Sequence, residues 1–473
     1  MRSGSLLLLL AVLSGCTSSR TASPSTVVDL AIAHVAVVDV EDGGIARDQN
    51  VLISGSRIVA VGPSARVRIP SGVQMFDASG LYLIPGLWDM HVHSGGDDSV
   101  ERDVFLPLYV AHGVTGIRDM AGRALNFEHR ASIAAGTLLG PRMVVGSPFV
   151  DGPNPTFPEH SVRLASPAEA RRAVDSLRAE GYEFIKTYKY LSAEVYRTLH
   201  ERAAEVGMEI SGEIPISVSL WEAAALGHRT VEHLTGLELA CSSREEELRL
   251  EYSRRAEEIS ADSTRRAHLP VWIQTEWEPI PSVDPERCAE LYRHLAAYGT
   301  WVVPTLMIQR LISFPEDPEL RDHPGQRFLP EGEWDPDAHA EFFDPERRLR
   351  PTYEHRFRTL PDLHRAGVGI LAGTDVPFGF TLHHELELYV RSGLTPLDAL
   401  RTATLNPARY LGRIDVLGTV APGKLADLIL LDANPLEDVR NTRTIRAVVI
   451  DGRLLDRFAL DQVLASVKAA ANP

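Results

Sequence analysis

The middle of the chain repeats one pattern, in which a short apolar segment is followed by a stretch with helical periodicity. Apolar segments of this kind begin near residues 113, 142, 184, 207, 230, 301 and 368. One intervening stretch, SPAEARRAVDSLRAEG, opens on serine and proline and closes on glycine, as a helix does. Strands that alternate with helices form a parallel sheet, and about eight such units predict an α/β fold with a closed (β/α)8 barrel of the TIM type.

The sequences on either side of this region share a different pattern. In residues 27–84 short β-branched runs alternate with turns. The same pattern occurs near the C-terminus, in KLADLILLDANPLEDV and TIRAVVIDGRLL. We therefore expect one small β-sandwich domain built from both chain ends, residues 27–84 and 414–473, with a C-terminal helix. The barrel would occupy residues 85–413. A chain of 473 residues is long enough for both domains.

The first residues, MRSGSLLLLLAVLSGC, have the layout of a secretory signal, because the apolar run is too short to span a bilayer. LSGC resembles the lipobox of bacterial lipoproteins, in which the signal is cut before the cysteine and the cysteine, here Cys16, is lipidated. Residues 17–26 would form a linker. A threonine rather than an aspartate at position 17, directly after the cysteine, resembles the pattern of lipoproteins sorted to the outer membrane. These features predict a lipoprotein anchored on the periplasmic face. The alternative is an ordinary signal with an incidental cysteine.

The net charge and the cysteine content limit which ligands the chain can bind and which disulfides it can form. The net charge of -16 disfavours nucleic acid, since binding phosphates requires a basic face. After Cys16 only Cys241 and Cys288 remain. The sequence leaves open whether they pair, and because neither lies in a CxxC motif we favour buried or free thiols. Assembly into a homo-oligomer is also left open.

Polar residues at the ends of the apolar segments are the candidates for chemistry, because barrel active sites lie at the C-terminal ends of the strands. His91 and His93 alternate along one strand, so both imidazoles face the same side and can reach one metal ion. Lys186, His233 and Asp375 close later segments. Taken singly, each has an ordinary alternative: polar strand ends for the two histidines, a solvent-seeking lysine, a core histidine and a helix-capping aspartate.

Together these residues and their surroundings resemble the amidohydrolase superfamily, and within it the imidazolonepropionase-like and prolidase-like group, which includes secreted and lipoprotein peptidases. The motifs that carry the resemblance span nearly the whole mature chain. They are LIPGLWDMHVH, HGVTGIRDM, YEFIKTY, GHRTVEHLTG, VGILAGTDVPFGFTLHHELELYVRSGLTPLDALRTATLNPARYLG and GTVAPGKLADLILLDANPLEDV.

The resemblance implies a centre with two divalent metal ions, zinc or a similar ion. His91 and His93 would bind the more buried ion together with Asp375, a carboxylated Lys186 would bridge the two ions, and His233 would bind the more exposed ion. A metal-bridging hydroxide would attack the substrate carbonyl, and Asp375 would act as the acid and base. Tyr188 could donate a hydrogen bond to the carbonyl oxygen or simply pack at the rim of the barrel.

One residue departs from the family pattern. Relatives carry a histidine after the fifth strand, in a stretch such as Gly-His-Val-Pro, whereas this chain reads SGEIP with Glu213 at that position. A glutamate is a competent zinc ligand, so Glu213 is a candidate for the second ion. It would add a negative charge to the centre, and loss of the second ion is the competing outcome.

These features predict a metal-dependent hydrolase that cleaves amide bonds of small molecules without a covalent enzyme intermediate. The expected substrates are dipeptides, as in prolidases, or N-acyl amino acids. Two alternatives are a barrel lipoprotein that lost the chemistry and acts as a binding protein, and a mononuclear deaminase. Glu213 supports the first alternative, and Lys186 at the bridging position argues against the second.

Overall fold

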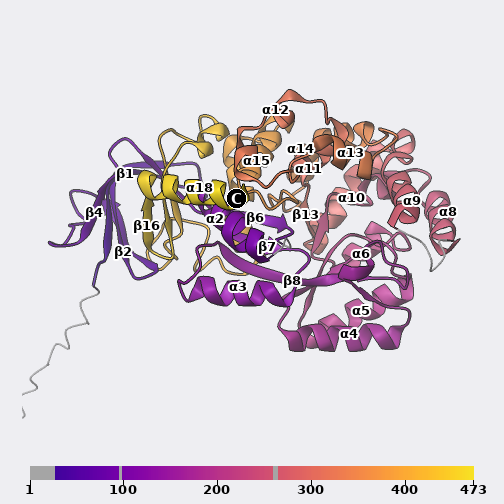
Figure 1. The fold of residues 1–473 in the computed structure, drawn as a ribbon. Helices are drawn as coiled ribbons and strands as arrows, with labels where there is room; N and C mark the ends of the chain where they lie inside the picture. Colours follow the sequence, from indigo (N-terminus) through magenta and orange to yellow (C-terminus); the bar gives the residue numbers. More distant parts are fainter. Residues whose placement is uncertain (1–26, 95–97, 259–264, 473) are drawn as a thin grey trace, which may run out of the picture.

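The computed structural model describes residues 27–94, 98–258 and 265–472. Two sheets organise these residues, one at the centre of a helical shell and one to its side (Figure 1). The predicted signal, the predicted lipidation site Cys16 and the predicted linker at 17–26 lie outside the described residues. Within the described residues, no helix combines the length and the apolar content needed to cross a bilayer.

The central sheet contains seven parallel strands in the order β13-β12-β11-β10-β8-β7-β6, and β9 (Ser161–Arg163) pairs with β8 beside this path. These seven strands, β6 included, follow one another around the sheet in chain order, with helices between them, as the sequence pattern predicts. Their bounds are β6 Leu87–Val92, β7 Val114–Asp119, β8 Arg142–Asp151, β10 Phe184–Thr187, β11 Glu209–Gly212, β12 Thr230–Glu232 and β13 Trp301–Val303.

Residues 369–375 take the eighth position, between the last strand and the first. The Val302 N–H donates to the Gly369 carbonyl at 2.9 Å on one side, and the Met90 N–H donates to the Ala372 carbonyl at 2.8 Å on the other. This segment is not a regular strand, yet its backbone connects β13 to β6. The predicted α/β barrel with an additional β domain is confirmed.

The helices that follow the strands cover the outside of the sheet. α4 (Pro167–Glu180) begins where the sequence predicts, with the Ser166 side chain accepting from the Glu169 N–H, and ends at Gly181 with a φ of 94°. α5 (Ala193–Val206) packs beside it (Figure 1). Other helices of this shell are α2 Leu106–Ala111, α3 Ala124–Ala134, α6 Leu220–Ala225, α10 Pro285–Tyr298, α15 Thr381–Ser392, α16 Pro396–Thr402 and α17 Leu405–Tyr410.

The second sheet combines strands from both ends of the chain, and its indigo and yellow strands lie together in Figure 1. Its order is β16-β15-β14-β5-β1-β2-β3, with β4 pairing with β1. The C-terminal helix α18 (Arg457–Ala471) packs against α2 of the barrel. The strands are β1 Leu30–Val38, β2 Ile45–Ser54, β3 Arg57–Pro63, β4 Gln74–Asp77, β5 Tyr82–Pro85, β14 Leu428–Leu431, β15 Ile445–Ile450 and β16 Arg453–Asp456.

Further helices extend the barrel after β12 and after β13. The first group lies between β12 and α10, and the second group precedes the segment at 369–375. Residues of α9, α11, α13 and α14 line one cavity with the ends of the barrel strands, so these helices stand over the mouth of the barrel. The bounds are α7 Leu237–Cys241, α8 Glu245–Glu258, α9 Arg265–Trp277, α11 Leu306–Ser313, α12 Pro318–Arg321, α13 Pro336–Phe343 and α14 Arg350–Arg365.

A disulfide joins the last residue of α7 to the first turn of α10. Cys241 and Cys288 are 47 positions apart in sequence, and their Cα atoms lie 4.8 Å apart. Our preference for buried or free thiols was therefore wrong. The pairing depends on the packing of α7 against α10, which no local spacing reveals.

Candidate metal centre and active site

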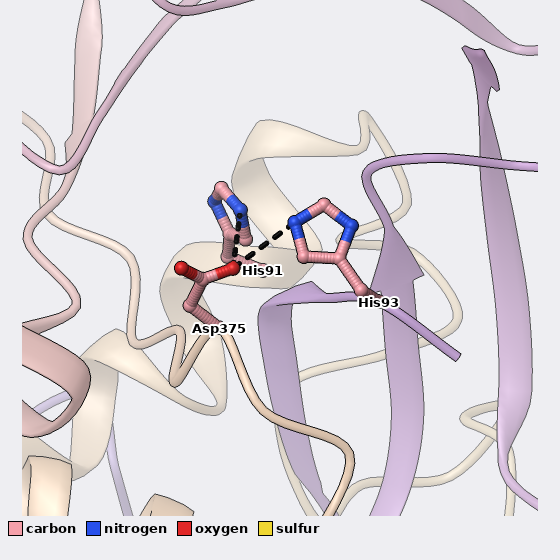
Figure 2. A group of neighbouring side chains, drawn as sticks. All are labelled: His91, His93 and Asp375. Carbon is pink, nitrogen blue, oxygen red and sulfur yellow. Dashed lines mark ion pairs between the residues drawn. The ribbon is translucent and has the colours of Figure 1, made fainter. Parts of the chain in front are cut away.

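His91, His93 and Asp375 converge at the C-terminal end of the first barrel strand (Figure 2). One oxygen of Asp375 lies 3.3 Å from His91 Nε2 and 3.0 Å from His93 Nε2. One possible ligand atom from each residue lies within 4.8 Å of the others. Two imidazoles and a carboxylate are a suitable donor set for zinc or a similar divalent ion.

Glu232 and Arg118 fix the orientation of His91 from below. Glu232 Oε2 lies 2.6 Å from His91 Nδ1, and the Arg118 guanidinium binds the other oxygen of Glu232 at 2.5 Å. Burial alone would raise the pKa of Glu232, but the charges of Arg118 and His91 hold that pKa well below its ordinary value. The carboxylate therefore keeps the Nδ1 proton in place and leaves His91 Nε2 to face Asp375. This nitrogen is buried and has no hydrogen-bond partner in the part of the chain that the structure describes.

Three residues at the strand ends adopt left-handed backbone conformations that are rare outside glycine. The φ angles are 59° at His233, 49° at Thr305 and 62° at Asp375. Backbone hydrogen bonds hold two of them: the His233 N–H donates to the Val303 carbonyl and the Asp375 N–H to the His91 carbonyl, both at 2.8 Å. Such strain persists where the surrounding structure enforces it, and it is frequent at functional sites.

Lys186 is the next-to-last residue of β10 and lies inside the barrel, with only 1% of its surface exposed. Its ammonium nitrogen has no hydrogen-bond partner among the described residues, and burial lowers its pKa below the ordinary lysine value. The alternative of a solvent-seeking lysine is therefore wrong. Since burial favours the neutral amine, Lys186 is in a suitable state to react with carbon dioxide and form the bridging carbamate that the family resemblance implies.

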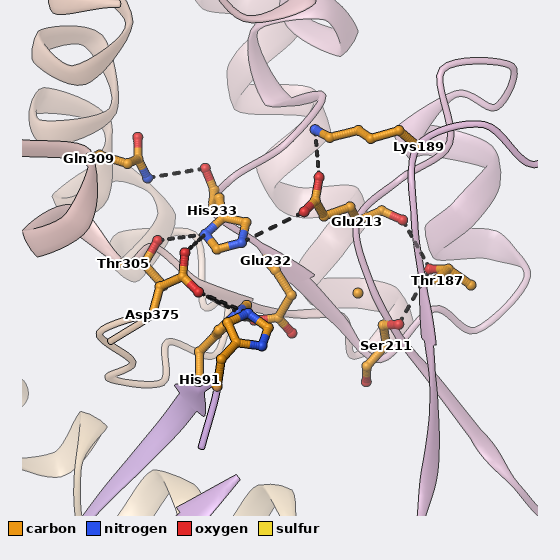
Figure 3. A network of polar contacts seen from close by, with 12 residues as sticks. His91, Thr187, Lys189, Ser211, Glu213, Glu232, His233, Thr305, Gln309 and Asp375 are labelled. Atoms are coloured by element: carbon orange, nitrogen blue, oxygen red, sulfur yellow. Dashed lines mark hydrogen bonds and ion pairs between the residues drawn. The ribbon is translucent and has the colours of Figure 1, made fainter. Parts of the chain in front are cut away.

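Glu213 and His233 lie opposite each other across the strand ends (Figure 3). Glu213 Oε1 is 3.8 Å from His233 Nε2, and the Nδ1 atom of His233 is hydrogen-bonded to Thr305 Oγ1 at 2.7 Å. Burial lowers the pKa of His233 to about 3, so the imidazole is neutral near pH 7. Neither residue belongs to the tight group of His91, His93 and Asp375.

Lys189, which no sequence motif singled out, pairs with Glu213. Its ammonium lies 2.6 Å from Glu213 Oε2 and 3.4 Å from Glu276 Oε1. Burial alone would raise the pKa of Glu213, but the nearby charge of Lys189, with those of His233 and Lys186, lowers it. Glu213 is therefore a carboxylate, with one oxygen bound to an ammonium and the other turned toward His233.

A cavity of about 430 Å³ opens onto these residues. Its floor is polar, with Lys186, Glu213, His233 and Asp375, while its walls are largely aromatic and aliphatic. Tyr188 belongs to one wall, where its ring centroid lies 4.8 Å from that of Phe149 and 5.6 Å from that of Phe157. The opposite wall comes from the helices over the mouth and includes Trp272, Ile308, Ile312 and Phe343.

A buried ion-pair network links those helices to the barrel. Arg356 on α14 binds both oxygens of Glu238 on α7, at 2.8 and 2.9 Å, and also contacts Glu276 on α9. Glu276 in turn contacts Lys189. Sequence reasoning missed this network, since charged residues in helical segments ordinarily indicate a solvated face.

Comparisons with known proteins indicate one family of enzymes. Residues 287–455 match the model of the Amidohydrolase family. The chain is 23% identical over 424 residues to ochratoxinase of Aspergillus niger, an alignment that covers 77% of this chain and 73% of that protein. The resemblance to the amidohydrolase superfamily is confirmed.

Solved amidohydrolase structures share the fold over nearly the whole described chain. Bottromycin amidohydrolase superimposes with a TM-score of 0.70 at 22% identity, over 93% of this chain and 90% of that one. A putative prolidase from Bifidobacterium longum gives 0.66 at 23% identity, over 93% and 99% of the two chains. At these identities the likeness establishes the fold, with its barrel and additional domain.

Proposed function

We propose that this amidohydrolase is a metal-dependent enzyme that hydrolyses amide bonds of small molecules. The observation that carries the proposal is the group of His91, His93 and Asp375 at the mouth of the barrel, with the buried Nε2 of His91 turned toward Asp375. These three residues would hold one divalent ion. A carboxylated Lys186 would bridge it to a second ion held by His233 and Glu213.

The chain's own side chains supply orientation and proton transfer. When bound, divalent ions would polarise the scissile carbonyl and lower the pKa of a water molecule enough for it to attack near neutral pH. Asp375 would take the proton released by that attack and pass it to the departing nitrogen. We assign Tyr188, which lines the same cavity, the role of donor to the carbonyl oxygen.

The proposed substrates are dipeptides or N-acyl amino acids. The apolar walls around Phe149, Phe157 and Trp272 favour a substrate with at least one large apolar group beside the amide. Similarity to a protein described as a prolidase supports the dipeptide class. We also propose that the enzyme is a lipoprotein anchored through Cys16 on the periplasmic face of the outer membrane, a proposal that rests on the signal-like first residues, the LSGC motif and Thr17.

A substrate panel tests the activity. Purified protein loaded with zinc is assayed with dipeptides, with N-acyl amino acids and, as a comparison class, with aminated bases. We expect hydrolysis of an amide that stops on removal of metal with a chelator and returns with zinc. Lys186→Ala and Lys186→Arg should both abolish it, because neither side chain forms the carbamate. Full activity after metal removal, or in either Lys186 variant, would contradict the proposal.

A further inference from the structure

Lys189 is a buried ammonium beside the centre, with 1% of its surface exposed. It lies 2.6 Å from Glu213 Oε2, 3.4 Å from Glu276 Oε1 and 5.0 Å from the ring centroid of Trp272. Withdrawing a lysine from water is costly unless strong partners compensate for the lost hydration. The proposed reaction gives this lysine no task, since it does not line the cavity at the strand ends.

Because of the position of Lys189, the two carboxylate oxygens of Glu213 have different neighbours. Oε2 faces the ammonium, and Oε1 lies 3.8 Å from His233 Nε2 (Figure 3). Two donor atoms at this separation can share one divalent ion, because zinc binds nitrogen and oxygen donors at about 2.0–2.2 Å. The ammonium thus holds the carboxylate in a rotamer that presents a single oxygen to the imidazole.

Charge gives the pairing a second effect. Glu213 stands where the family pattern has a neutral imidazole, so a carboxylate there adds one negative charge beside Asp375 and the proposed carbamate. Excess negative charge would hold a metal more tightly but weaken its pull on a carbonyl. A lysine at 2.6 Å cancels that added charge in a buried site, where water screens poorly.

We propose that Lys189 is a positioning residue that compensates the charge of Glu213, so that the pair acts as a neutral ligand for the second ion. This inference rests on the proposed function, because it takes the second ion from it. It follows that Glu213 and Lys189 must change together. Glu213→His alone would leave Lys189 with one carboxylate fewer and place its positive charge next to a divalent cation.

Metal content tests the inference without an activity assay. Zinc-loaded, desalted protein is analysed by plasma mass spectrometry for the wild type, Glu213→His and Glu213→His/Lys189→Met. We expect about two ions per chain in the wild type, about one in Glu213→His and about two again in the double variant. Glu276→Gln is the matched control: it removes the other carboxylate partner of Lys189 while Glu213 stays paired, and it should keep about two ions.

Retention of two ions by Glu213→His alone would overturn the inference. A neutral pair, Glu213→Gln/Lys189→Met, guards against loss of folding, because it leaves no charge to compensate. It should fold and hold about one ion, and two ions in it would also overturn the inference. A wild type with one ion that still hydrolyses an amide would refute this inference and the second ion, but it would leave the proposed amide hydrolysis standing. Two ions in the wild type without hydrolysis of any amide would refute the proposed amide hydrolysis and leave this inference standing.

Discussion

Glu232 Oε2 lies 2.6 Å from Nδ1 of His91, and both side chains are completely buried. The carboxylate is itself held by Arg118, so the imidazole has one orientation and one tautomer available. A hydrogen bond of this kind commonly controls how well a histidine binds a metal.

Replacing Glu232 with glutamine should weaken metal binding by about 10–100-fold, since the amide oxygen accepts the hydrogen bond from Nδ1–H more weakly than a carboxylate and leaves Arg118 without its charge partner. Competition with a chelator of known affinity measures the change. Glu209→Gln provides the control, because that carboxylate pairs with Arg229 on the outside of the barrel. Equal metal affinity in Glu232→Gln and wild type would show that the contact does not orient the ligand.

Asp375→Asn should keep the fold and lower kcat by roughly two to four orders of magnitude, because an amide cannot shuttle the proton. Circular dichroism checks the fold, and steady-state kinetics on the best substrate of the panel give kcat and KM separately. If only KM rises, Asp375 positions the substrate and another group transfers the proton.

The ion pair of Glu238 and Arg356 predicts how the stability of the folded protein depends on pH. Burial alone would raise the pKa of Glu238, but the charge of Arg356 and hydrogen bonds from His355 and Arg356 lower it to about 2, from an ordinary value of 4.5. A carboxylate whose pKa falls on folding stabilises the native state above the unfolded pKa. That stabilisation is lost as the pH drops from about 4.5 toward 2.

Melting temperatures between pH 2 and pH 7 should therefore fall steeply below about pH 4.5 in the wild type. Arg356→Met should lower stability at neutral pH by about 3–5 kcal/mol, because it leaves Glu238 as an uncompensated buried charge. In the same variant the melting temperature should fall less steeply as the pH drops below about 4.5. A fall as steep as that of the wild type would show that other carboxylates cause the loss of stability in acid.

Cys16→Ser should move the protein out of the membrane fraction or leave its signal uncleaved, since the proposed lipid anchor requires the thiol. Fractionation and immunoblotting of wild type and variant, expressed in a bacterium with a lipoprotein pathway, measure the change. Unchanged membrane association in the variant would contradict the lipoprotein proposal.

The barrel and the positions of five site residues could be predicted because both depend on local rules. Alternation along a strand places His91 and His93 on one side, and the order of strands in a barrel brings Lys186, His233 and Asp375 to the same end. The predicted eighth strand is only a backbone segment at 369–375. Gly373 packs so closely there that an added Cβ would lie 2.7 Å from the Cβ of His91.

The supporting residues could not be predicted, because their partners are far apart in sequence. Arg118 sits within a strand and meets Glu232 from 114 positions away. Lys189 follows Lys186 by three residues, and its pattern gives no hint that it is buried. Only packing of the helices over the mouth against the barrel reveals that Glu276 and Arg356 face inward.

The left-handed backbones at His233, Thr305 and Asp375 bear on how this protein would respond to selection for heat resistance. Glycine is the residue that adopts these conformations without strain, so glycine at any of the three positions would relieve local strain. At His233 and Asp375 it would also delete a proposed ligand. Libraries screened for thermal survival alone should therefore enrich inactive variants at these strand ends, and an engineered, more robust enzyme would have to gain its stability elsewhere in the fold.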